Sequence, residues 1–268
     1  MSALLDLLEV TDAGSGTWRG RASGPAGKRA YGGQLMAQSL AAASRTVDPV
    51  KALTSVHLQF LRGGDAGEPV DYRVEAVFDG RTAASRRVEG RQGDRLLTTA
   101  SVSFAATLPG PEHGHRALPG DPAEMAPTGP PGPAPSLPLD ELDIRFADTA
   151  DDEGFVRRLW WRATVEVPAD PLVHLLVAAY VTDIYLIDPA LQVHGHSMRS
   201  RSHRSGTTDS SIWFHRPVRA DRWNLLECRS PAGARGRGVV TADLLGADGD
   251  QVATLVQEGL IAEREPVD

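Results

Sequence analysis

Helix-length apolar segments and shorter alternating segments divide the chain into two similar halves. Residues 31–47 (YGGQLMAQSLAAASRTV) are rich in alanine and repeat their apolar positions near a period of 3.6, which predicts a helix. Residues 170–187 (DPLVHLLVAAYVTDIYLI) begin with Asp170 and Pro171, a pair typical of a helix N-cap and first turn. The N-terminal run MSALLDLLEV has the pattern of a short amphipathic helix. Each half therefore has one long helix for its strands to enclose.

The other patterned segments predict strands. Between several of them stand DG and GD pairs, which mark hairpin turns in antiparallel sheets. The order of strand, helix and antiparallel meander occurs twice along the chain. The predicted strands cover residues 17–21, 53–61, 69–80, 81–92, 95–106, 158–168, 210–218, 223–230, 234–250 and 251–262.

Local similarity between the two meanders supports an internal duplication. Phe60-Leu61-Arg62 resembles Phe214-His215-Arg216, and EGRQGDRLLTTASVSF resembles LGADGDQVATLVQEGL, which matches Ser101 with Gln257. Two such halves can pair their sheet edges with each other. We therefore predict an α+β fold of the double hotdog type, in which two tandem units each have a central helix wrapped by a curved antiparallel sheet.

The segment 108–138 separates the two halves. It is dense in proline and glycine and has no apolar period, which is typical of a linker. We expect an N-terminal hotdog unit over residues 1–107 and a C-terminal hotdog unit over residues 139–268.

Composition narrows the class of protein. The chain has 268 residues, of which 41% are apolar and 24% charged, enough for a core without cross-links. The single cysteine, Cys228, lies in the apolar run WNLLECR, so we expect a buried, unreactive thiol. The net charge of −7 disfavours nucleic-acid binding, and the apolar run 172–181 is too short to span a membrane. These features favour a cytoplasmic protein, and no cysteine or histidine cluster has the spacing of a metal site.

Three polar residues stand where an apolar element would exclude them. Asp183 interrupts the second helix, where a carboxylate is costly unless it is hydrogen-bonded or functional, although an outward-turned helix end explains it equally well. Thr207 belongs to a hydroxyl-rich stretch that reads more simply as a turn before a strand beginning near Ser210. Gln257 lies in VATLVQEGLI, as either a buried amide that needs partners or a polar residue of an edge strand. Asp209 has no assigned role.

The pentapeptide GHSMR (195–199) approaches the nucleophile elbow of serine hydrolases, G-x-S-x-G. Arg199 replaces the last glycine, and the surrounding segment has the composition of a loop, whereas the elbow needs a strand before it and a helix after it. A serine hydrolase is therefore disfavoured.

From Tyr31 to Ile261, apart from the linker, the sequence resembles the type II acyl-CoA thioesterase family, which has a double hotdog fold. The segments that carry the resemblance are YGGQLMAQSL (31–40), HLQFLRGGD (57–65), DGRTAASRRV (79–88), TDIYLI (182–187), LQVHG (191–195), DSSIWFHRP (209–217), ARG (234–236) and VQEG (256–259).

The resemblance implies an enzyme that hydrolyses a fatty acyl-CoA to a free fatty acid and coenzyme A. In that family an Asp, a Thr and a Gln order one water molecule, and these match Asp183, Thr207 and Gln257 in the C-terminal unit. The resemblance implies no metal and no cofactor, since coenzyme A is part of the substrate. It also implies a homodimer or a higher homo-oligomer.

Thioester hydrolysis needs more than an ordered water. The carbonyl oxygen becomes anionic during the reaction and needs donors, for which the backbone at Gly32 and Gly33 is a candidate. The coenzyme A half of the substrate is polyanionic, so Arg86, Arg87 and Arg235 at strand ends are candidate contacts.

Two alternatives stay open. A hotdog enoyl-CoA hydratase uses an aspartate and a histidine in a D-x4-H loop before its helix, whereas Asp170 and His174 are one residue too close and lie within the helix. A non-catalytic acyl-CoA-binding hotdog protein would have no need of the Asp, Thr and Gln set, which is intact here. Release of thiol from acyl-CoA substrates separates the three functions.

Overall fold

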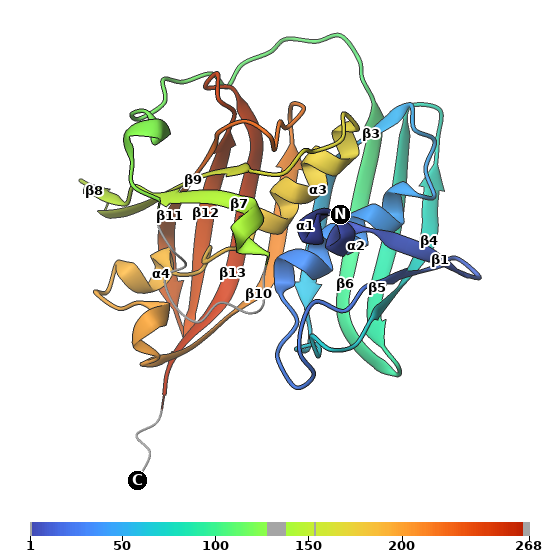
Figure 1. The fold of residues 1–268 in the computed structure, drawn as a ribbon, viewed down its shortest axis with the longest axis horizontal. Coiled ribbons are helices and arrows are strands. Elements are labelled where there is room, and N and C mark those ends of the chain that lie inside the picture. The colour runs from blue at the N-terminus through green and yellow to red at the C-terminus, as the bar shows by residue number, and fades with distance from the viewer. Residues whose placement is uncertain (1, 128–137, 153, 265–268) are drawn as a thin grey trace.

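Two long helices lie side by side at the centre of the protein, and a curved antiparallel sheet of 13 strands wraps around them (Figure 1). The computed structural model describes residues 2–127, 138–152 and 154–264. The helices are α1 (Ala3–Leu8), α2 (Gly32–Ser44), α3 (Pro171–Thr182) and α4 (Pro189–Gln192), with 3₁₀ turns η1 (Pro122–Glu124), η2 (Leu139–Glu141) and η3 (Met198–Ser200). The strands are β1 (Val10–Gly14), β2 (Thr17–Gly20), β3 (Lys51–Phe60), β4 (Val70–Asp79), β5 (Ala83–Gln92), β6 (Arg95–Ala106), β7 (Leu142–Phe146), β8 (Thr149–Asp151), β9 (Gly154–Ala163), β10 (His203–Phe214), β11 (Asn224–Ala234), β12 (Arg237–Leu245) and β13 (Gln251–Glu263).

The two halves of the chain share the sheet. Its order is β1-β2-β4-β5-β6-β3-β10-β13-β12-β11-β9-β7, and β8 pairs with β9. β3 and β10 join the halves through antiparallel pairs that run from Ser55 opposite Trp213 to Gln59 opposite Asp209. The predicted α+β double hotdog architecture is confirmed, and so is the prediction that each half pairs its edge with the other.

The central helices are apolar on nearly all sides because the sheet and the partner helix surround them. Tyr31, just before α2, donates its hydroxyl to the carbonyl of Tyr180 in α3 at 2.7 Å, and the two rings pack edge to face. This contact fixes the N-terminal end of α2 against the C-terminal turn of α3. In the part of the chain that the structure describes, no helix is both long enough and apolar enough to cross a membrane.

The same β-bulge occurs in β3 and in β10. In β10 the register against β13 shifts between Thr207 and Asp209, and in β3 the register against β6 shifts between Leu53 and Ser55. A matching bulge at the same place in both halves supports the internal duplication.

The bulges also correct the sequence-based match of the two halves by one residue. Ser210 pairs with Gln257 three residues after Thr207, and Val56 pairs with Val102 three residues after Leu53. The counterpart of Gln257 is therefore Val102, and the match to Ser101 is wrong.

Most predicted segments form the expected elements, although several boundaries shift by a few residues, and two of the shifts affect the site. α3 ends at Thr182 instead of 187, because the chain turns at Tyr185, whose φ of 57° lies in the left-handed region. β10 begins at His203 instead of near Ser210, so the hydroxyl-rich stretch is part of the strand and the turn interpretation is wrong. The short strands β1, β7 and β8 were not predicted.

The described part of the predicted linker contacts the C-terminal half. The carbonyl of His113 accepts a hydrogen bond from Arg216 at 3.0 Å, and that of Gly114 accepts one from the backbone N–H of Gln251 at 2.7 Å. Residues 128–137 of the linker lie outside the described residues. The division of the chain into units at 107 and 139 stays a prediction.

Candidate active site

The C-terminal turn of α3 meets the N-terminal turn of α2 with almost no space between them. Asp183 is the C-cap of α3, and its Oδ2 lies 2.5 Å from the place a Cβ would take on Gly32. A Cβ on Gly33 would lie 2.3 Å from the carbonyl oxygen of Tyr180. Any larger side chain at either glycine would push the two helices apart. The glycines thus bring the positive end of the α2 dipole to the Asp183 carboxylate.

The structure brings Asp183, Thr207 and Gln257 together at this point. The Thr207 hydroxyl donates to Oδ1 of Asp183 at 3.1 Å, and the Gln257 amide Nε2 donates to the same oxygen at 3.4 Å. The Gln257 amide also donates to the hydroxyl oxygen of Thr207. The backbone N–H of Gly33 donates to the carboxylate as well. Segments far apart in the sequence are therefore joined around one carboxylate, which lies at the end of the helix and not within it.

Burial raises the pKa of the Asp183 carboxyl group from 3.8 to about 6. The hydrogen bonds from Thr207, Gln257 and Gly33 and the positive charge of Arg29 oppose this rise, because they stabilise the ionised form. At neutral pH the group is ionised, yet it is basic enough to take a proton from a bound water.

The bulge in β10 decides which hydroxyl reaches Asp183. Alternate residues of a regular strand share a face, yet Thr207 faces inward together with buried Ser210, because the bulge adds one residue between them. The hydroxyl of Thr208 turns away and donates to the backbone carbonyl and the carboxylate of Glu258, at 3.1 Å each. Asp209 accepts a hydrogen bond from the backbone N–H of Glu258 at 3.3 Å. That contact gives Asp209 a structural role at the bulge.

Gln257 lies in β13, between β10 and β12, and its side chain is buried. The interpretation as a buried amide with partners is confirmed, and the edge-strand alternative is wrong. β13 pairs with β10 on one side and with β12 on the other, and this pairing fixes the position of the Gln257 amide.

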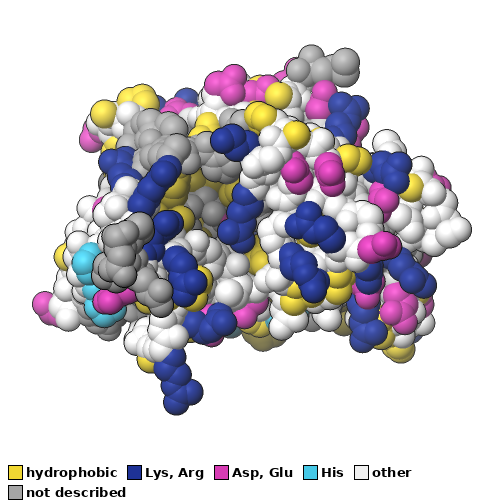
Figure 2. Space-filling view, turned by 90° about the horizontal axis from the view of Figure 1, so that it is seen from below, with side chains coloured by type: hydrophobic (Ala, Val, Ile, Leu, Met, Phe, Trp, Pro, Cys, Tyr) yellow, Lys and Arg dark blue, Asp and Glu magenta, His cyan; other side chains and the backbone are white. Residues whose placement is uncertain are grey.

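Asp183 faces a cavity of about 530 Å³ that both halves line. This volume is in the range of small-molecule sites. Figure 2 shows a hollow on this face of the molecule, with hydrophobic side chains inside it and Lys and Arg side chains gathered around it. The apolar lining includes Leu35, Phe60, Leu139, Ile184, Leu186, Ile187 and Met198, and the basic lining residues are Lys28, Arg29, Arg62 and Arg201.

Of the predicted substrate contacts, Gly32 lines the cavity, and Arg86 does not. The Arg86 side chain is 3% exposed and donates to Asp79 at 2.7 Å and to the hydroxyl of Thr46 at 2.8 Å. Thr46 lies just beyond the C-terminal end of α2, about 20 Å along the helix from Gly32. Arg86 therefore ties two strands to the far end of α2, and its assignment as a coenzyme A contact is wrong.

Arg87 and Arg235 also lie away from the described lining of the cavity. Arg87 is on the outer face of the sheet and forms an exposed ion pair with Glu75 at 3.6 Å. Arg235 is exposed in the turn between β11 and β12, where its φ is 55°.

Lys28, Arg29 and Arg62, which line the cavity, were not among the predicted contacts. Lys28 and Arg29 stand one residue before YGGQLMAQSL, and Arg62 lies within HLQFLRGGD, so two motifs of the resemblance lie beside them or contain them. Arg201 lies in the Arg-, Ser- and His-rich stretch 196–205. Loops have no periodicity that would show which of their charges meet, so the sequence alone could not assemble this group.

Two other expectations are confirmed. Cys228 is buried among apolar residues, and burial raises the pKa of its thiol, which keeps it unreactive. Ser197 of GHSMR caps the 3₁₀ turn η3, accepting from the backbone N–H of Arg199 at 3.2 Å. It is therefore no nucleophile elbow.

Known proteins resemble this chain over almost its whole length. A family model described as the acyl-CoA thioesterase N-terminal domain matches residues 21–105, and the corresponding C-terminal domain model matches residues 117–261. Acyl-CoA thioesterase 2 from Haemophilus influenzae is 28% identical, covering 97% of this chain and 97% of its own length. Acyl-coenzyme A thioesterase 8 from Homo sapiens is 28% identical, covering 93% of this chain and 86% of its own length.

A solved structure agrees with the sequence matches. The crystal structure of acyl-CoA thioesterase II TesB2 from Mycobacterium marinum has a TM-score of 0.83 at 27% identity, covering 98% of this chain and 99% of that one. Since the two family models together cover both hotdog halves, and the C-terminal model alone covers more than half of the chain, this protein belongs to the acyl-CoA thioesterase family.

Proposed function

We propose that this protein hydrolyses the thioester of a fatty acyl-CoA to a free fatty acid and coenzyme A through a water molecule held at Asp183. The observation that carries the proposal is the carboxylate of Asp183, bonded by Thr207 and Gln257 at the wall of a cavity with an apolar lining. The family relationship supports the reaction, and the geometry supports the role of each residue.

Asp183 is the general base. It accepts one proton from the water while the water oxygen attacks the carbonyl carbon of the thioester, and a pKa of about 6 suits this transfer near neutral pH. The Thr207 hydroxyl and the Gln257 amide bond the same carboxylate oxygen, so they hold the carboxylate in one orientation towards the water. A thioester is weakly stabilised by resonance, so a well-placed water suffices without a covalent intermediate.

The N-terminal turn of α2 stabilises the oxyanion. As the new C–O bond forms, the carbonyl π electrons move onto oxygen, and the backbone N–H of Gly32 is the candidate donor beside the cavity, because that of Gly33 is bonded to Asp183. Collapse of the tetrahedral species restores the carbonyl and breaks the C–S bond. The departing coenzyme A thiolate takes the proton that Asp183 holds, which returns Asp183 to its carboxylate form.

The geometry does not favour the hydratase alternative. Asp170 caps the start of α3 by accepting from the backbone N–H of Leu172 at 2.9 Å, and His174 accepts from the backbone N–H of Ala220 at 3.1 Å. Both residues therefore have structural bonds at the N-terminal end of α3, whereas the cavity lies at its C-terminal end beside Asp183.

The test measures free thiol released from a panel of saturated acyl-CoA substrates by the wild-type protein and by Asp183→Asn. We expect turnover in the wild type and a loss of at least about 100-fold in kcat for the variant, because the general base is gone. Asp12→Asn, in the exposed strand β1, is the matched control and should turn over as the wild type does.

Three outcomes separate the candidate functions. No thiol from any substrate would overturn the thioesterase proposal, and tight binding in that case would favour the non-catalytic binder. Hydration of crotonyl-CoA would favour the hydratase. Independence of metal and cofactor, a cytoplasmic location and a homo-oligomer stay predictions.

A further inference from the structure

The cavity mouth gathers positive charge that the protein leaves unpaired. Lys28, Arg29, Arg62 and Arg201 line the cavity and are exposed, and Asp183 is the one acidic residue among the described lining residues. None of the four cations forms an ion pair with another residue that the structure describes. Elsewhere arginines commonly have aspartate partners, as in Arg19–Asp71 at 2.6 Å and Arg145–Asp143 at 2.9 Å. On a chain of net charge −7, such a cluster indicates an anionic ligand.

Arg29 crosses the cavity mouth between the two halves. Its Nε lies 3.3 Å from the place a Cβ would take on Gly63, just beyond β3, and its Nη1 lies 3.8 Å from the corresponding place on Gly206 in β10. A Cβ on Gly63 would crowd the guanidinium, whereas a Cβ on Gly206 would lie at ordinary contact distance from it. Its charge also reaches Asp183, whose pKa it lowers.

Arg62 and Arg201 line the cavity from opposite halves of the chain. Arg62 follows β3, and its Nη1 donates to the carbonyl of Leu96 at 3.1 Å. Arg201 follows η3 in the left-handed conformation, with φ of 52°.

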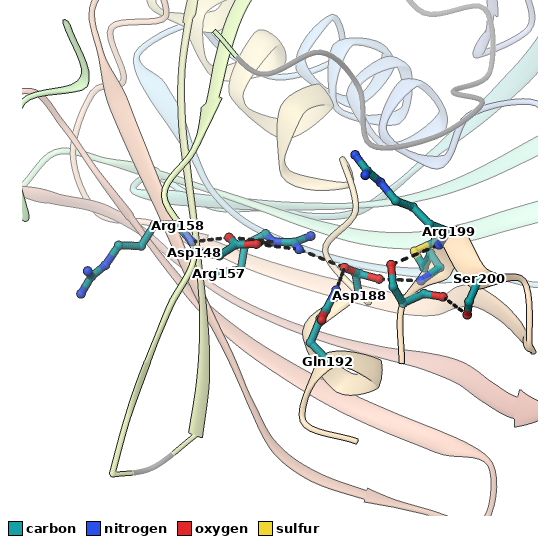
Figure 3. A network of polar contacts seen from close by, with 9 residues as sticks. Asp148, Arg157, Arg158, Asp188, Gln192, Arg199 and Ser200 are labelled. Atoms are coloured by element: carbon teal, nitrogen blue, oxygen red, sulfur yellow. Dashed lines mark hydrogen bonds and ion pairs between the residues drawn. The ribbon is translucent and has the colours of Figure 1, made fainter. Parts of the chain in front are cut away.

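A buried ion pair sets the position of the segment that carries Arg201 (Figure 3). Asp188 accepts from Arg157 at 2.9 Å, from the Gln192 amide at 3.0 Å and from the backbone N–H of Met198 at 2.7 Å. Asp188 and Arg157 are 4% and 5% exposed, so their bonds are shielded from water. Met198 begins the 3₁₀ turn that Arg201 caps at its C-terminal end. The segment that carries Arg201 is therefore held in place before a ligand binds.

We propose that Lys28, Arg29, Arg62 and Arg201 form the binding site for the phosphate groups of coenzyme A. The inference rests on the proposed function, which supplies a substrate with several phosphates at one end and a thioester at the other. Arginine guanidinium groups suit phosphate because they can donate two parallel hydrogen bonds. The site fixes the polyanionic end at the exposed mouth while the thioester reaches Asp183 and the acyl chain enters the apolar lining.

The test compares two substrates that differ only in phosphate. One is the acyl-CoA that the wild type hydrolyses fastest, and the other carries the same acyl group on pantetheine, which has no phosphate. We expect Arg62→Gln and Arg201→Gln each to raise KM for acyl-CoA about threefold to tenfold, with kcat within about twofold. The same variants should leave KM for the pantetheine ester unchanged. Arg81→Gln, in the exposed turn between β4 and β5, is the control and should change neither KM.

The dependence of KM on salt concentration tests the same site without a mutation. Raising the NaCl concentration should raise the wild-type KM for acyl-CoA and leave that for the pantetheine ester unchanged, because salt screens exposed charges. Equal KM changes for both substrates, or no change for acyl-CoA in either variant, would overturn the phosphate site. Hydrolysis of neither substrate by the wild type would instead overturn the proposed function, so the two failures are distinguishable.

Discussion

The C-terminal ends of the two central helices hold corresponding positions in the two halves and carry different side chains. Each long helix ends in a cap residue near a bulged strand and the strand that pairs with it across the bulge. At the end of α3 these positions hold the Asp, Thr and Gln of the proposed site. Their counterparts at the end of α2 are Arg45, Leu53 and Val102.

Two of these counterparts are packing residues, whereas Arg45 is exposed. Leu53 and Val102 are 7% and 0% exposed and belong to the main core. The N-terminal ends of the two helices also differ. α2 begins with Gly32 and Gly33, which leave space for the Asp183 carboxylate, whereas the Asp170 side chain that caps α3 accepts a hydrogen bond from the first turn of its own helix. Both halves therefore share the arrangement of a helix end beside a bulged strand. Small and polar side chains make the C-terminal end of α3 a site, whereas Leu53 and Val102 make the corresponding strand positions beside α2 part of the core.

The strongest test of this comparison is Leu53→Ala. Removing a buried leucine side chain should lower the free energy of unfolding by about 3 kcal/mol, measured by urea titration. At a temperature where both proteins are folded, kcat for acyl-CoA should stay within about twofold, because this end does no chemistry. A fall in kcat without a loss of stability would contradict the division of roles.

Thr207→Val sharpens the comparison from the catalytic side. Valine has nearly the shape of threonine but cannot donate to Asp183, so kcat should fall about 10- to 100-fold, with KM within about threefold. Thr208→Val is the matched control, because the hydroxyl of Thr208 bonds Glu258 on the other side of the bulge. It should retain kcat within about twofold, and similar losses in both variants would refute the bulge argument.

The smallest expected effect is on the free energy of unfolding, which the burial of the ionised Asp183 carboxylate lowers. The pKa of Asp183 is about 6 in the folded protein and near 3.8 in the unfolded chain. Between these values a rise in pH removes the proton from the unfolded chain first, so wild-type stability falls across this range and levels off above pH 6. Asp183→Asn lacks this loss. It should be more stable than the wild type at pH 8 by about 1 to 2 kcal/mol, since water in the cavity screens part of the charge, and equally stable at pH 3.5.

Urea titrations of both proteins at pH 3.5 and pH 8 measure that difference. In the same range, wild-type kcat/KM should fall as pH drops through 6, because the base becomes protonated. A stability difference that does not change with pH would show that the Asp183 charge is not its source.

The alternating patterns predicted the fold well because most of the inner sheet face is core. The patterns gave a wrong prediction where the inner face forms the site. The first half of β10 has inward hydroxyl groups in place of apolar side chains, so this part of the strand was predicted to be a turn. Residues 184–187 were wrongly predicted as helix for the opposite reason. Ile184 and Leu186 are apolar because they line the cavity, and their apolar character extended the predicted helix beyond its end at Thr182.

Adjacent arginines show a limit that the sequence could have revealed. Arg86 and Arg87 are neighbours in β5, so their side chains point to opposite faces, and only one of them could meet solvent on the outer face. The burial and bonding of Arg86 needed the structure, because its partners Thr46 and Asp79 come from two other elements. The catalytic set came from a resemblance, since spacing gave no sign that residues 183, 207 and 257 meet.

The bulge in β3 has a practical consequence for protein engineering. Because this strand already has the additional residue at Thr54, a hydroxyl introduced at position 53 would face inward without any insertion or deletion. The N-terminal half thus has the same bulged strand as the half with the candidate site, with apolar side chains in place of the hydroxyl and the amide. Placing a second inward hydroxyl in this polypeptide therefore needs a substitution alone, with the chain length and the hydrogen-bonding ladder left as they are.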